Sequence, residues 1–182
     1  GGQSRSRVAG LDVVTGLATF WNPSAFGTLS ALATGPNHEV FTGGSFSGIG
    51  GLARGNLAAF NSRTGVVTPW APNSDNTVQT MVAGPDRVYV GGSFTQVGGL
   101  ARANLAALDP LTGLALSWAP SVNGQVLALA LGGQRLYVGG LFTLLGGQLH
   151  SNLGALDLTT GLAHAWTANA DDQVFALEAS TG

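Results

Sequence analysis

Residue types that carry chemistry recur at a near-constant spacing along this chain of 182 residues. One series is basic and consists of Arg5, Arg54, Arg102 and His150. Arginine offers planar, multi-donor hydrogen bonding that suits carboxylates and sugar oxygens. With nearby acids and amides, these positions predict a polar binding rim of Arg54, Arg102, His150, Asp75, Asn123 and Asp172. The alternative is that each arginine only braces its own loop.

Four tryptophans recur at a similar spacing. Trp21, Trp70, Trp118 and Trp166 are separated by 49, 48 and 48 residues. A row of rings could stack on a ligand, but one ring at the same place in every unit favours packing between neighbouring units. We therefore expect a structural role and four equivalent, mostly buried sites.

The remaining reactive side chains do not form a recognisable centre. His38, His150 and His164 fall at three different places in the repeat, which argues against a histidine metal cluster. The chain has no cysteine and no nucleophile elbow. Asp171-Asp172 and Ser74 to Asn76 are expected to be solvated turns. We expect no catalytic residue, no bound metal and no cofactor.

The spacing reflects an internal repeat. Residues 50–97 and 98–145 align without a gap and share 23 identities in 48 positions. Two glycine pairs recur in each unit, as Gly43-Gly44, Gly91-Gly92 and Gly139-Gly140, and as Gly1-Gly2, Gly50-Gly51, Gly98-Gly99 and Gly146-Gly147. They open no helix, so we expect backbone clearance and turns from them, not phosphate binding.

Each unit contains four short apolar segments, here called A to D. The repeat of residues 98–145 contains, in chain order, segment C at 104–108, D at 114–118, A at 126–131 and B at 135–138. Turn residues separate them. Between C and D, Asp109 to Gly113 follows the pattern Asp-x-x-Thr-Gly, which predicts a tight hairpin turn. Four antiparallel strands per unit predict an all-β fold, a partial or complete β-propeller.

The unit boundaries follow from this register. We expect an incomplete blade with strands C and D at 1–28, complete blades at 29–76, 77–124 and 125–172, and the first strand of a further blade at 173–182. The B to C and D to A loops should emerge at one end of the blades. Function tends to lie in long loops on a rigid scaffold, so this end is the candidate binding face.

The sequence pattern of the repeat resembles that of known propellers. The runs Val88 to Thr95, Gly98 to Asn104 and Leu105 to Asp109 resemble kelch-type blades and, more closely, the delta-60 repeat propellers of bacterial surface and secreted proteins. The resemblance covers essentially the whole chain. It implies a β-propeller fold and a secreted or cell-surface location, and it carries no enzymatic activity. Arg7 departs from it, because Asn56, Asn104 and Asn152 occupy the equivalent places.

The composition argues against two classes of partner, nucleic acid and the membrane interior. A net charge of −2 and 9% charged residues give no basic field for nucleic acid. No apolar run is long enough for membrane insertion. We expect a non-catalytic module that binds a protein or glycan, or a structural unit of a larger surface protein or fibre. Further blades of the same chain or another copy would close or extend the array. A propeller-based hydrolase or lyase has less support, because the recurrent acids lie mainly in hairpin turns.

Overall fold

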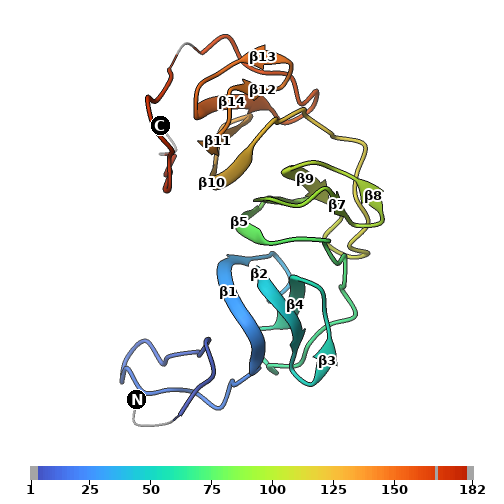
Figure 1. Cartoon of the computed structure of the whole chain (residues 1–182). Helices are drawn as coiled ribbons and strands as arrows, with labels where there is room; N and C mark the ends of the chain where they lie inside the picture. Colours follow the sequence, from blue (N-terminus) through green and yellow to red (C-terminus); the bar gives the residue numbers. More distant parts are fainter. Residues whose placement is uncertain (1–3, 167, 180–182) are drawn as a thin grey trace.

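The chain forms an open arc of antiparallel β-sheets (Figure 1). The structure, a computed structural model, describes residues 4–166 and 168–179, and these contain no helix. Gly1-Gly2 and parts of the two predicted terminal units lie outside those ranges. Within them, no helix is long and apolar enough to cross a membrane.

Three larger sheets follow one another along the chain. Their orders are β1-β2-β4, β5-β6-β9 and β10-β11-β14, and all pairings are antiparallel. The strands are β1 (Ala25–Thr34), β2 (Glu39–Ile49), β4 (Leu57–Asn61), β5 (Val78–Ala83), β6 (Val88–Gly92), β9 (Leu105–Leu108), β10 (Gln125–Gly132), β11 (Arg135–Leu141) and β14 (Leu153–Asp157). Strands β1, β5 and β10 lie along the inner side of the arc in Figure 1.

The segments predicted as fourth strands are attached to their sheets by single antiparallel bridges. Phe60 bridges Val67, Leu108 bridges Ala115, and Leu156 bridges Ala163. The turn before each bridge has the predicted form. The Asp109 carboxylate accepts bonds from the Leu111 and Thr112 amides (2.9 and 2.7 Å), and Gly113 has φ +76°. The hairpins therefore form, with a very short ladder.

β2, β6 and β11 each contain a Gly-Gly pair, and the first glycine of the pair lets the neighbouring sheet approach closely. A Cβ on Gly91 would lie 2.5 Å from a methyl of Val126 in the next sheet, and one on Gly43 would lie 2.6 Å from a methyl of Val78. The second glycine clears its own sheet, because a Cβ on Gly92 would lie 2.1 Å from the Thr77 carbonyl oxygen. Both contacts agree with the predicted role of backbone clearance.

The core lies between the sheets and contains the central tryptophans. Trp70 and Trp118 are buried, whereas Trp21 and Trp166 are half-buried. The indole N–H of Trp70 donates to the Asp109 carbonyl of the next sheet (3.0 Å). Only two of the four rings therefore have the burial expected for all of them. Trp21 contacts Phe60 of the first sheet and Trp166 contacts Tyr137 of the third, so each packs against one of the three sheets, whereas Trp70 and Trp118 lie between two.

The last part of the arc adds to the third sheet without forming a strand. The Val174 amide donates to the Gly140 carbonyl (3.1 Å), and the side chains of Val174 and Leu177 pack against Gly139. This segment occupies the place that β5 and β10 take against the preceding sheets. Its path follows the predicted A segment of a further repeat.

Candidate binding face

Two kinds of loop meet at one end of the sheets. We call this end the loop face; it comprises residues 45–56, 93–104 and 141–152 together with 71–76, 119–124 and 168–172. Backbone hydrogen bonds join them directly, for example from Ser74 to Gly55 (3.0 Å) and from Gly98 to Pro72 (3.0 Å). The A to B and C to D turns meet at the opposite end, where the Ser62 amide donates to the His38 carbonyl (2.6 Å). The predicted grouping of the loops is thus present.

Each longer loop contains a tight hairpin. β7 (Gln96–Val97) pairs with β8 (Leu100–Ala101), and Gly98 and Gly99 between them have φ +60° and +82°. Two consecutive positive φ angles are the geometry of a type I′ turn, which glycine adopts without strain. β12 (Leu144–Leu145) and β13 (Gln148–Leu149) repeat the arrangement, as does β3 (Leu52–Ala53) after β2.

An asparagine at the end of each loop ties the two kinds of loop together. Asn56 has φ +66°, its Oδ1 accepts from the Phe46 amide (3.0 Å), and its Nδ2 donates to the Ser74 carbonyl (3.0 Å). Asn104 and Asn152 have the same backbone conformation and donate to equivalent carbonyls. Asparagine tolerates left-handed φ better than other non-glycine residues, which explains its recurrence here.

Arg7 makes the donated one of these hydrogen bonds with a longer side chain. Its φ is +69°, and its Nη1 donates to the Ala25 carbonyl at 2.6 Å. Ala25 lies 18 residues after Arg7, the separation found between Asn56 and Ser74. The departure from the repeat therefore preserves the donated hydrogen bond, but a guanidinium has no acceptor to replace the Asn Oδ1.

The arginines of the predicted rim contact their own loops. Arg54 donates from Nη1 to the Ala53 carbonyl (2.9 Å) and from Nη2 to the Thr68 carbonyl (3.1 Å). Arg102 donates in the same way to Ala101 and Leu116, both at 2.8 Å. These contacts support the brace alternative, because they join each loop to the segment that follows the C to D turn. Each guanidinium keeps its positive charge on this face, and its buried Nε makes no hydrogen bond to the described residues.

His150 fills the same place with a shorter side chain. It is only 6% exposed, and its Nδ1 is buried with no hydrogen-bond partner among the described residues. Its ring packs against Gly154, where a Cβ would lie 3.3 Å from the ring. The third member of the basic series is therefore enclosed, unlike the half-buried Arg54 and Arg102.

Asp75 and Asn123 cap the start of a long loop. The Asp75 carboxylate accepts bonds from the Thr95 hydroxyl and from the amides of Thr95 and Gln96 (2.8 and 3.0 Å). The hydrogen bond from the Thr95 hydroxyl lowers the pKa of Asp75. Asn123 accepts from the amides of Thr143 and Leu144, both at 2.9 Å.

Asp172 occupies a different repeat position. Its carboxylate accepts from the adjacent Gln173 amide (2.7 Å), as the Asn76 side chain does from Thr77. The equivalent of Asp75 and Asn123 in that repeat is its neighbour Asp171, which is exposed. Alignment of the four tryptophans would have identified Asp171 from the sequence.

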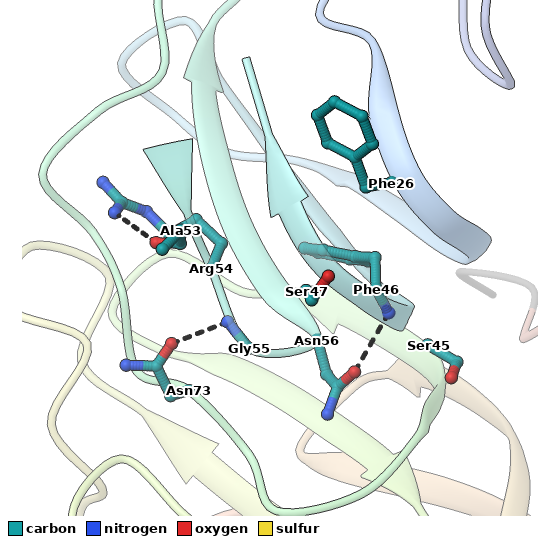
Figure 2. Close-up of a pocket in the computed structure, with 9 residues that line it drawn as sticks. All are labelled: Phe26, Ser45, Phe46, Ser47, Ala53, Arg54, Gly55, Asn56 and Asn73. Carbon is teal, nitrogen blue, oxygen red and sulfur yellow. Dashed lines mark hydrogen bonds between the residues drawn. The ribbon is translucent and has the colours of Figure 1, made fainter. Parts of the chain in front are cut away.

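Two hollows open on the loop face. One is lined by Arg102 and Asn123 together with Ala101, Ala103, Ser121 and Leu144, so the structure brings two predicted rim residues into one site. The other is larger, about 670 Å³, and contains Arg54. Figure 2 shows Phe26 on one side of it and Asn73 and Arg54 on the other. Phe26 was not among the predicted site residues.

Potential metal ligands do not cluster on the described part of this face. Among residues 4–166 and 168–179, no three His, Cys, Asp or Glu side chains are close enough together to hold a metal ion. The carboxylates of Asp12, Asp109 and Asp157 all accept hydrogen bonds within their own turns. The loop face carries hydroxyl and amide groups together with exposed large apolar side chains such as Leu100 and Leu149.

Known structures resemble this arc, although no family model and no curated protein matches the chain. The computationally designed Ika8 protein covers 94% of this chain with a TM-score of 0.60 and 18% identity. The designed Ika4 protein covers 82% (TM-score 0.56, 18% identity), and the WD40 domain of Neurospora crassa Pan2 covers 83% (0.55, 12%).

These similarities concern the fold. The chain spans 78% of Ika4, 46% of Ika8 and 43% of the Pan2 domain. WD40 domains are β-propellers built from four-stranded sheets around a central axis. The chain, with its antiparallel sheets arranged in an arc, therefore has a β-propeller-like fold.

Proposed function

We propose that this chain is part of a non-catalytic, extracellular β-propeller with four-stranded blades of about 48 residues, and that its loop face binds a protein or glycan. The repeat length comes from the spacing of the tryptophans. The extracellular location rests on the resemblance to delta-60 repeat propellers. The sheets act as the rigid support and the loops as the variable surface.

One observation carries the binding role. The long loops are held by the same hydrogen bonds in successive repeats, yet the hollows that they form differ in size and lining. A surface with a constant frame and varied lining suits recognition, because the frame lowers the entropy lost on binding. The opposite end has short turns whose polar groups are engaged with one another, such as Arg63 with His38.

The half-buried tryptophans favour a second candidate role, as an assembly unit. Trp70 and Trp118 are covered by a following sheet, whereas the Trp166 ring is only half covered. Further blades, from the same chain or another copy, would complete that packing. A scaffold of this kind needs no ligand on the loop face, so binding experiments separate the two roles.

The test is a screen of the labelled chain against arrayed glycans and surface-protein ectodomains. Leu100→Glu alters the loop face and Leu111→Glu the opposite end of the same repeat; both leucines are exposed. We expect binding that Leu100→Glu abolishes and Leu111→Glu preserves, with both variants folded by circular dichroism. Absence of any bound probe, or equal loss in both variants, would refute the binding role and favour the assembly role.

A further inference from the structure

One repeat position on the loop face carries a different chemical type in the first sheet. Counting from the tryptophans, Phe26 corresponds to Asp75, Asn123 and Asp171. Asp75 and Asn123 use their oxygens to hold the amides of the following loop. A phenyl ring cannot accept those bonds, and Phe26 is 69% exposed.

The backbone of the first sheet compensates for this exchange. Phe26 lies in β1 and pairs directly with Gly48 of β2, so the strand ladder continues where the other repeats use a side-chain cap. The Phe26 ring lies beside Gly48, since a Cβ there would be 3.5 Å from a ring carbon. Gln96 and Leu144 occupy the equivalent of Gly48. The glycine thus leaves space for the ring, which stays exposed although the loop is held without it.

The ring borders the hollow of about 670 Å³ on the loop face, and two hydroxyl groups lie in the same lining. Ser45 and Ser47 are exposed, and neither hydroxyl has a hydrogen-bond partner among the described residues. Each hydroxyl supplies one donor and two acceptor positions. Asn73, across the hollow in Figure 2, donates to Ala71 and accepts from Gly55. An exposed ring, two unused hydroxyls and a fixed wall therefore line the same hollow.

Charge in this hollow comes from Arg54 alone. The two terminal nitrogens of Arg54 donate to the carbonyls of Ala53 and Thr68, and Figure 2 shows its guanidinium on the side away from Phe26. An anionic ligand would therefore meet a cation already engaged with the backbone. The free groups near the ring are neutral, which favours an uncharged ligand.

We propose that Phe26, Ser45 and Ser47 form a subsite for a neutral oligosaccharide, with one pyranose unit packed on the Phe26 ring. A pyranose ring has one face of C–H groups, which packs on an aromatic ring, and hydroxyls at its edge, which pair with serine hydroxyls. This inference rests on the proposed binding role of the loop face and names its ligand class. It assigns the site to the first sheet only, where the ring replaces the capping side chain.

The experiment titrates the full chain with cellohexaose and chitohexaose as neutral probes and with hexagalacturonate as the anionic one, by calorimetry and NMR. Phe26→Ala should weaken neutral-probe binding about tenfold or more, as truncation of an aromatic stacking platform does. Phe26→Trp should retain or improve it. Phe175→Ala is the matched control, because Phe175 is equally exposed (68%) and lines the inner side of the arc. It should bind as the wild type does.

Several outcomes would overturn the sugar subsite. These are no binding of either neutral probe, unchanged binding by Phe26→Ala, or tighter binding of hexagalacturonate. If the neutral probes fail while an arrayed protein binds in a Leu100-dependent manner, the subsite is refuted and the loop face keeps its proposed role. If neither binds, both proposals fail.

Discussion

The indole N–H of Trp118 donates a 3.2 Å hydrogen bond to the carbonyl oxygen of Asp157, 39 residues later in the turn of the next repeat. The ring also packs edge-on against Tyr89 of its own sheet, with centroids 5.1 Å apart. Trp70 makes the same pair of contacts with Asp109 and Phe41. A single side chain therefore joins two successive sheets.

Replacement of Trp118 by alanine should lower the free energy of unfolding by about 3 to 5 kcal/mol, the usual cost of removing a large buried aromatic. Trp118→Phe should cost less, because it keeps ring packing and loses the hydrogen bond. Leu114→Ala is the control, since Leu114 is exposed. Urea unfolding measures all three, and an unchanged midpoint for Trp118→Ala would show that the ring does not support the core.

Gly92→Ala should also destabilise the fold, for a steric reason. The added Cβ would lie 2.1 Å from the Thr77 carbonyl oxygen, which is backbone and cannot move aside cheaply. We expect a loss of about 1 to 3 kcal/mol or more, as for other overpacked sites. Gly84→Ala is the matched control, because its nearest neighbours would be 3.6 Å away. Similar melting temperatures for the two variants would contradict the close approach.

The fold was largely predictable because its constraints are local. Paired glycines, Asp-x-x-Thr-Gly turns and a tryptophan at one place per repeat each demand a particular backbone or a particular buried site. The length of the last strand was not predictable in this way. Segments such as 114–118 have strand-like composition, but only Ala115 forms a bridge, because that edge of the sheet holds Trp118 against the next repeat instead of extending the ladder.

The turn carboxylates should make stability fall in acid. Backbone amides of Thr15, Thr112 and Thr160 hold the pKa values of Asp12, Asp109 and Asp157 below the ordinary value of 3.8. Since the unfolded chain then binds protons first, the contribution to stability is complete above the unfolded pKa and disappears as pH falls through the folded pKa.

The second of the four copies of this turn, at residues 61–65, supplies the control. Asn61 accepts the same amide bonds from Arg63 and Thr64 (both 3.0 Å) without a charge. The triple variant Asp12→Asn, Asp109→Asn, Asp157→Asn should therefore stay folded at neutral pH and lose less stability on acidification. Urea unfolding at about pH 6 and about pH 3, on either side of the ordinary pKa, measures the difference. Equal acid sensitivity of variant and wild type would refute the assignment.

Variants of Arg7 test whether the hydrogen bond to the Ala25 carbonyl requires the long arginine side chain or can be made by asparagine, as in the other repeats. Arg7→Ala should destabilise the first loop by about 1 kcal/mol, because the Ala25 carbonyl loses its donor. Arg7→Asn should equal or exceed the wild type, since asparagine suits φ +69° and makes this bond in the other repeats. Hydrogen exchange of the nearby amides localises the effect. A less stable Arg7→Asn would show that the longer side chain is required.

The site was less predictable than the fold, for a physical reason. Recurrent arginines mark a shared environment, but the direction of a long side chain depends on loop carbonyls such as that of Thr68, which the sequence does not place. Phe26 was missed because the gapless comparison covered only residues 50–145. A comparison aligned on all four tryptophans exposes the exchange of Asp or Asn for Phe.

The arginine pair distinguishes a brace from a ligand contact. Because Arg54 and Arg102 each donate to two backbone carbonyls, the double variant to alanine should lose about 1 to 2 kcal/mol of stability per site, and its melting temperature should fall. Arg63→Ala is the control, since the exposed Arg63 side chain hydrogen-bonds to His38 at the opposite end; this variant should melt as the wild type does. Differential scanning calorimetry measures stability, and the array screen measures binding. An unchanged melting temperature combined with lost binding would instead make the guanidinium groups direct ligand contacts, as the sequence alone first suggested.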